Sequence, residues 1–359
     1  MKRWICALVA LYTFLCGAAL AETERFVWTA GTVKFDASVE PAPAGASALH
    51  ARLFDPAAQH DAFLTGLANH YGASFDLKFE GGARNSPDWQ YSYSYSNGKR
   101  LYVTGNWGIA LSTSHSRYAT FLDAGHGEVL EESREFLSFA TPGQAMAQGT
   151  ALLQAMGLDG EYSLRYFYSV NGERYRAAVE ETRAAYAEMG KKFDAPELTD
   201  FGDDTEIAYV IAFEQSAQGL PIAASLSANG IWSRPASDMT VTPQGVDSVN
   251  LNLPVTILQA GEEQPLIPYA QAAAAMAEAW ENSLLGYQPL YVRHIRLTYV
   301  MQRSDPNSLD VTLIPAWEFA TMEESDDILL EYNYVNAITG ECQYYDTADI
   351  PVSYTHLTL

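Results

Sequence analysis

Apolar and polar residues alternate along much of the chain, and a period of two is typical of half-buried β-strands. The stretches that alternate in this way, and that we therefore predict to be strands, are residues 33–41, 89–105, 107–114, 161–170, 207–232, 246–258, 291–303, 309–320, 328–337 and 342–346. Asn97-Gly98 lies between two aromatic alternating runs and predicts a tight hairpin turn. Gly219 predicts a second turn inside 207–232, and Pro221 places a strand edge or bulge beside it.

Four other segments repeat apolar residues every three or four positions, which is the period of an amphipathic helix. These predicted helices cover residues 55–72, 141–157, 171–190 and 267–286. We predict Asp55 as the N-cap of the first helix, and Thr141 with Gln144 as a capping box that begins the second. Pro268 is predicted to open the fourth helix.

Helices placed between groups of strands predict an α+β fold, in which antiparallel sheets carry helices packed on one face. The order helix, strand, strand, strand occurs from Thr141 to Trp232, interrupted by one helix, and again from Pro268 to Tyr345. We therefore expect an N-terminal α+β domain at residues 22–140, built from a strand, a helix and a hairpin. A duplicated α+β domain is expected at residues 141–350.

Residues 1–21 have the features of an export signal. Lys2 and Arg3 precede an apolar run from Trp4 to Leu15, and Ala19-Leu20-Ala21 is a small-x-small cleavage site. We therefore expect a secreted or cell-surface, extracytoplasmic protein. The alternative is a lipoprotein acylated at Cys16, and a lipid at Cys16 would then be its attachment to the membrane.

The net charge limits the kinds of partner that we expect, and the cysteine content limits the disulfides. The formal net charge of the whole sequence is −23, and such a surface repels nucleic acid and anionic lipid, so we expect no nucleic-acid partner. Cys342 is the one cysteine outside residues 1–21. We therefore expect no intrachain disulfide, and we predict Cys342 to be a buried strand cysteine.

The familiar catalytic and metal-binding motifs are missing from the sequence. It contains no zinc-protease helix, no EF-hand loop, no phosphate-binding glycine loop and no serine-hydrolase elbow. We predict no catalytic residue, no metal and no cofactor. Two weaker alternatives stay open: a metal bound by Asp123, His126 and Glu128, and surface calcium at the acidic segments 200–206 and 323–327.

An aromatic ladder is the most suggestive local feature. Trp89, Tyr91, Tyr93 and Tyr95 alternate with polar residues, so their rings share one face, and Trp107 is expected to join them across the hairpin. On an exposed face the rings would be a platform for a sugar or peptide. On a buried face they are core, which we favour because any half-buried strand alternates in this way.

Three stretches carry a family resemblance: “FEQSAQGLPIAASLSANGIW” from Phe213, “LIPAWEF” from Leu313 and “YNYVNAITGE” from Tyr332. They resemble the repeated PepSY-like modules of exported Gram-positive proteins, and their order and spacing are similar to the YycI/YycH-type regulators of a cell-wall histidine kinase. They resemble still more a family of uncharacterised clostridial secreted proteins and lipoproteins, over roughly Glu206 to Tyr345.

The resemblance implies a protein of Firmicutes with two PepSY-like modules and a regulatory or protein-binding role without catalysis. The partner it implies is an envelope protein or a sensor ectodomain. It also places Pro315 and Trp317 at the cap of an edge strand. The chain departs from the YycI/YycH regulators at its beginning, because those keep an N-terminal membrane helix where this sequence has a cleavable signal.

The last residues, “VSYTHLTL” from Val352 to Leu359, match a reading frame of a widely used transposon sequencing adapter. Pro351 fits the same frame. We therefore expect residues 351–359 to be adapter-derived and His356 not to be a ligand.

Three functional hypotheses follow. The first is an exported, non-catalytic regulatory or protein-binding protein of the Gram-positive cell envelope. The second is a carbohydrate- or peptide-binding surface protein that uses the aromatic ladder. The third is a secreted hydrolase whose acidic residues the sequence does not reveal.

Overall fold

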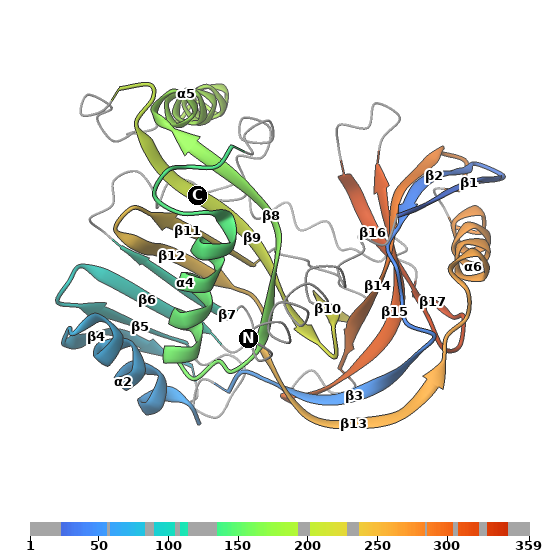
Figure 1. Cartoon of the computed structure of the whole chain (residues 1–359), viewed down its shortest axis with the longest axis horizontal. Helices are drawn as coiled ribbons and strands as arrows, with labels where there is room; N and C mark the ends of the chain where they lie inside the picture. The colour runs from blue at the N-terminus through green and yellow to red at the C-terminus, as the bar shows by residue number, and fades with distance from the viewer. Residues whose placement is uncertain are drawn as a thin grey trace, which may run out of the picture. The chain divides into compact units, whose positions relative to one another are not determined.

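The computed structural model describes residues 23–55, 58–82, 90–104, 108–113, 135–192, 202–227, 237–283, 286–303, 308–322 and 329–343 (Figure 1). The chain forms two compact units. Unit 1 comprises Met1–Ser47, Glu263–Thr298 and Pro315–Leu359, and unit 2 comprises Ala48–Glu262 and Tyr299–Ile314. The predicted boundary at residue 140 lies inside unit 2, and the division into sequence modules at 22–140 and 141–350 stays a prediction.

Unit 2 is built on an antiparallel sheet whose strands pair in the order β4, β5, β6, β7, β12, β11, β9, β8. The bounds of these strands are β4 (Phe75–Gly81), β5 (Gln90–Tyr95), β6 (Lys99–Thr104), β7 (Gly108–Thr113), β8 (Glu161–Asn171), β9 (Glu206–Ala217), β11 (Ser237–Thr242) and β12 (Gly245–Leu251). The predicted hairpin turn is confirmed, because the Gly98 N–H donates to the Tyr95 carbonyl at 2.9 Å and Gly98 has φ +87°.

Helices cover both faces of this sheet. Apolar side chains of α2 (His60–Tyr71) and α4 (Pro142–Ala155) form one core with β5, β6, β7, β9, β11 and β12. α5 (Gly172–Glu188) instead forms a second cluster with Ala208 and Val210, which alternate along β9 with Tyr209 and Ile211 of the first core. The α+β class is confirmed, and α5 lies on the opposite face because β9 is apolar on both sides.

The capping residues in the sequence predicted the start of α4 correctly and the start of α2 wrongly. Thr141 and Gln144 form the predicted capping box, with the Gln144 N–H donating to the Thr141 hydroxyl at 3.2 Å. The N-cap prediction at Asp55 is wrong, because α2 begins at His60 after Gln59. Asp55 instead accepts the Ala58 N–H at 3.0 Å in the turn that precedes the helix.

Unit 1 combines the beginning and the end of the chain in one sheet. β1 (Glu24–Ala30) pairs antiparallel with β2 (Val33–Val39), and β2 pairs in parallel with β14 (Leu290–Gln302). β15 (Asp310–Met322), β16 (Leu329–Asn336) and β17 (Cys342–Gln343) pair antiparallel in that order. α6 (Tyr269–Glu281) packs on β16 and β17. Pro268 is its N-cap, as predicted.

Several strands differ from the sequence-based expectation. The predicted strand 246–258 is divided into β12 and β13 (Val255–Pro265), because Leu253 has φ +49° and Pro254 cannot donate to a ladder. Four strands, β1, β3 (Gly45–Leu53), β4 and β11, were not predicted from the sequence. β10 (Leu220–Ser227) pairs in parallel with β14.

Pro315 and Trp317 do not cap a strand as expected. They lie inside β15, which pairs with β3 from Asp310 to Leu313 and with β16 from Ala316 onward. The Pro315 carbonyl accepts the Ala337 N–H at 2.9 Å.

Candidate functional site

A pocket of about 500 Å³ opens in unit 1, and we call it the unit 1 pocket. Its walls come from β1, the loop after β2, the start of α6 and β15. The lining residues are Glu24, Val39, Glu40, Pro41, Ala42, Pro43, Ala44, Leu266, Ile267, Pro268, Tyr269 and Trp317. The wall is thus mainly apolar, with two carboxylates and two aromatic rings.

The local sequence explains why a pocket forms here. Pro41 and Pro43 have no N–H, so the segment after β2 cannot continue a ladder and leaves the sheet. Two bonds hold this segment and the start of α6 in place: the Leu266 N–H donates to the Ala44 carbonyl at 3.2 Å, and the Trp317 indole N–H donates to the Ile267 carbonyl at 2.9 Å. Trp317 is only 4% exposed, so the pocket has a fixed aromatic floor.

One carboxylate of the pocket is oriented by a tyrosine. The Tyr269 hydroxyl donates to Glu24 Oε1 at 2.7 Å. The pKa of Tyr269 is raised, chiefly because its proton is held by Glu24. Tyr269 also packs edge-on against Trp317, with ring centroids 6.0 Å apart. The ring pair and Glu24 therefore lie together at this side of the pocket.

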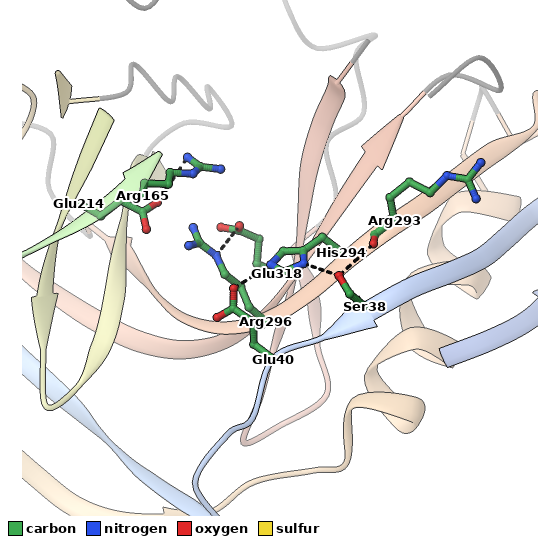
Figure 2. Close-up of polar contacts among 8 residues, drawn as sticks. All are labelled: Ser38, Glu40, Arg165, Glu214, Arg293, His294, Arg296 and Glu318. Atoms are coloured by element: carbon green, nitrogen blue, oxygen red, sulfur yellow. Dashed lines mark hydrogen bonds and ion pairs between the residues drawn. The ribbon is translucent and has the colours of Figure 1, made fainter. Parts of the chain in front are cut away.

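The other carboxylate is oriented by a histidine. His294 Nε2 lies 2.8 Å from Glu40 Oε1, and His294 Nδ1 lies 2.9 Å from the Ser38 hydroxyl (Figure 2). An ionised carboxylate only accepts, so Nε2 carries the proton. In the neutral ring Nδ1 is then an acceptor for the Ser38 hydroxyl, which also lies 3.5 Å from the Arg293 carbonyl. The three residues form a hydrogen-bonded series that ends at the rim of the unit 1 pocket.

A register irregularity places His294 in this series. The pairing of β2 with β14 shifts between Val292 and His294. Arg293 and His294 are both partly exposed, while Val292 and Ile295 on either side are buried. Bulges of this kind re-aim side chains, and here the shift brings two consecutive polar residues to the polar side of the sheet.

Beside this series lies a buried ion pair. Arg296 Nε donates to Glu318 Oε1 at 2.8 Å, from β14 to β15, and the two residues are 6% and 1% exposed (Figure 2). Burying both charges costs several kcal/mol per ion before their attraction is counted. The pair therefore fixes how β14 and β15 meet more than it adds to stability.

Unit 2 has its own cross-strand pair, drawn in the same view. Arg165 on β8 lies 3.3 Å from Glu214 on β9 (Figure 2). It supports the register of these two antiparallel strands.

The predicted aromatic ladder is part of the unit 2 core as far as the structure describes it. Tyr91, Tyr93 and Tyr95, which we call the tyrosine ladder, are 0%, 6% and 3% exposed. Tyr93 bonds His60 Nε2 at 2.9 Å, and burial raises the pKa values of Tyr91 and Tyr95. An exposed platform needs exposed rings, so these three do not support the binding alternative. Trp89 and Trp107 lie outside the described residues.

Of the remaining predicted positions, some lie within the described residues and others lie outside them. Cys342 is partly buried, and burial raises the pKa of its thiol to about 12, which makes it unreactive near neutral pH. Within segment 200–206, Asp203 pairs with Arg176. Cys16, the set Asp123, His126 and Glu128, segment 323–327 and the tail 351–359 lie outside the described residues. Among the described residues no group of three or more side chains is placed to hold a metal ion.

No helix in the described part of the chain is both long enough and apolar enough to cross a membrane.

No pattern in the sequence predicted the unit 1 site. Ser38 and His294 are 256 positions apart, and Glu40 and His294 are 254 apart. No window of sequence shows such a meeting. The one local signal is Pro41-Ala42-Pro43, which follows a strand directly after Glu40 and indicates a rigid segment at a sheet margin.

No protein-family model matches the chain, and no curated protein matches its sequence. Among solved structures, an uncharacterised protein from Eubacterium rectale is similar, with 10% identity, a TM-score of 0.60, and coverage of 90% of this chain and 94% of that chain. At this identity the likeness shows a shared fold alone.

The C-terminal domain of YpeB from Bacillus megaterium also aligns, with 12% identity over 82% of this chain and 97% of that chain. Its TM-score of 0.33 is too low to carry an argument. The resemblance to PepSY-like modules therefore stays a prediction from the sequence.

Proposed function

We propose that this chain is an exported, non-catalytic binding protein of the Gram-positive cell envelope, and that the unit 1 pocket receives a segment of a partner protein. The observation that carries the proposal is the pocket itself. Its volume of about 500 Å³ lies within the range of about 300–1,000 Å³ typical of ligand sites. Apolar walls with a few placed polar groups are the usual composition of such sites.

Unit 2 offers a contrast. Among its described residues, a cavity beside Phe54, Leu158 and Val255 has a volume of about 10 Å³, which is about the space of one water molecule. The unit 1 pocket is large enough for a side chain with its flanking backbone. Export from residues 1–21, and an envelope protein or sensor ectodomain as the partner, remain parts of the proposal that rest on the sequence.

A pocket-filling variant tests the proposal. Ala42 is exposed and lines the pocket, so Ala42→Trp fills it without touching the core. Peptides are selected from a random displayed library on the purified wild-type protein. They should bind the wild type and should not bind the Ala42→Trp variant. Ala274→Trp is the matched control, since Ala274 is exposed on α6 and does not line the pocket. Equal binding to both variants would contradict the proposal.

A second candidate function is a secreted hydrolase, and the series Ser38, His294 and Glu40 favours it. A hydroxyl and a carboxylate that each lie within hydrogen-bond distance of the same imidazole are the parts of an activated nucleophile. The nitrogens are exchanged relative to the usual serine hydrolases, in which the serine meets Nε2 and the acid meets Nδ1, so we place this candidate second.

Labelling distinguishes the two functions. A fluorophosphonate probe should modify Ser38 in a hydrolase, and the adduct should disappear in His294→Ala. Mass spectrometry of the labelled peptide identifies the residue. No adduct at Ser38 would remove the hydrolase candidate.

A further inference from the structure

We infer that the unit 1 pocket recognises a basic side chain, lysine or arginine, on the partner segment. This inference rests on the proposed function and names the chemistry of its ligand. The lining contains two glutamates and, among the described residues, no lysine, arginine or histidine. A ligand that buries itself there therefore meets two carboxylates, Glu24 held by a tyrosine hydroxyl and Glu40 held by a histidine.

The two carboxylates are held in place before a ligand arrives. Glu24 accepts from Tyr269 at 2.7 Å, and Glu40 bonds His294 at 2.8 Å. A carboxylate can accept about four hydrogen bonds, so an ammonium or guanidinium group adds to these bonds and does not displace them. Fixed acceptors of this kind lower the ordering cost of binding.

The aromatic floor favours the same class of ligand. Tyr269 supplies the more accessible ring, because Trp317 is buried beneath the pocket and its N–H is donated to the Ile267 carbonyl. Cations are attracted to the faces of tryptophan and tyrosine rings. Pro41, Pro43 and Ile267 supply apolar surface, which suits the aliphatic stem that carries the charge in lysine and arginine.

A metal ion fits less well than an organic cation. Calcium takes about six to eight oxygen ligands, and magnesium demands near-ideal octahedral geometry. The described residues hold no cluster of three or more metal-ligating side chains, whereas the apolar walls match an organic stem. The overall charge of −23 also draws basic segments toward the molecule.

Matched peptides test the inference. The probes are acetyl-Gly-Ala-Lys-Ala-Gly-amide and the same peptide with norleucine, which keeps the stem and lacks the charge. Titration is followed by the NMR signal of the Trp317 indole N–H, assigned with Trp317→Phe. We expect the lysine peptide to bind about tenfold more tightly, a difference of about 1.4 kcal/mol, because only its charged group can form charge-assisted hydrogen bonds with the carboxylates. Added salt should reduce this difference.

Charge-neutral variants complete the test. Glu24→Gln and Glu40→Gln should each remove most of the preference for lysine over norleucine. Glu278→Gln removes the same charge from an exposed position of α6 outside the pocket and should leave the preference unchanged. Thermal unfolding of each variant verifies that the fold is kept.

The outcomes separate this inference from the proposed function. Equal binding of both peptides, abolished by Ala42→Trp, would leave the pocket as a binding site and overturn recognition of a cation. Binding of neither peptide, or binding that Ala42→Trp does not change, would overturn both.

Discussion

The tyrosine ladder of unit 2 and the unit 1 pocket use aromatic rings in opposite ways. The ladder rings come from one strand, alternate with polar residues and are buried to 6% exposure or less. The pocket rings, Tyr269 and Trp317, come from a helix start and a distant strand and meet beside two carboxylates. Regular spacing within one strand thus marks packing in this protein, whereas the candidate site is made by segments that meet only in the fold.

Alkaline titration should give the largest effect on this comparison. Burial raises the pKa values of Tyr71, Tyr91, Tyr95 and Tyr162 in unit 2. The unfolded chain loses phenolic protons near pH 10, while these tyrosines retain theirs in the folded state. Stability is therefore complete below about pH 9 and falls as the pH rises above about 10. Urea unfolding at a series of pH values measures this loss.

Phenolate absorbance gives an independent reading of the same titration. Because burial raises their pKa values, Tyr71, Tyr91, Tyr95 and Tyr162 should ionise only when the protein unfolds. Ionisation of every tyrosine in one step with the fold intact would show that the ladder is accessible.

Truncation of the ladder should give the next largest effect. Tyr91→Ala, Tyr93→Ala and Tyr95→Ala each remove a buried ring and should each lower the free energy of unfolding by about 3–5 kcal/mol, as aromatic truncations in cores do. Tyr102→Ala is the matched control, because Tyr102 is 43% exposed on the neighbouring strand; its cost should be below about 1 kcal/mol. Near-wild-type denaturant midpoints for all three ladder variants would restore the platform hypothesis.

Breaking the buried ion pair of unit 1 should have a somewhat smaller effect on the free energy of unfolding. Arg296→Met leaves the Glu318 charge buried without Arg296 and should destabilise the protein by about 3 kcal/mol. The double variant Arg296→Met with Glu318→Leu should recover most of this loss, since both charges are then removed. A double variant as unstable as the single one would show that the pair itself contributes to stability.

The N-cap of α4 should show the smallest effect. Thr141→Ala removes the side-chain acceptor of the capping box and should cost about 1 kcal/mol. Gln154→Ala, at an exposed position near the other end of α4, should change stability by less than about 0.5 kcal/mol. A Thr141→Ala variant as stable as the wild type would mean that packing alone holds the start of α4.

The features that the sequence predicted correctly are those that depend on residues close together in the chain. The turn at Asn97-Gly98 and the capping box at Thr141 depend on side chains and backbone within four positions, and both are confirmed. The N-cap prediction at Asp55 was wrong for a local reason too, because the Asp55 carboxylate accepts a bond in a separate turn that precedes α2.

What could not be predicted depends on distant pairing. β4 was not predicted as a strand, and nothing in its own residues says that β5 will be its neighbour. The contact of Ser38 and Glu40 with His294 requires β2 to lie parallel to β14. A pattern read along the chain contains no such information, so the unit 1 site became visible only in the structure.

The parallel pairing of β2 with β14 has a consequence for how the protein is made. Val33 must find Leu290, and synthesis delivers Val33 long before Leu290. Contacts so far apart in sequence carry a large loop-closure cost and slow the folding of the elements that depend on them. We therefore expect the sheet of unit 1 to be completed late in folding. In the β1–β2 hairpin, Phe26 and Trp28 pack against Phe35. Before β14 pairs with β2, we expect these rings to be exposed, and a chaperone would be expected to cover them.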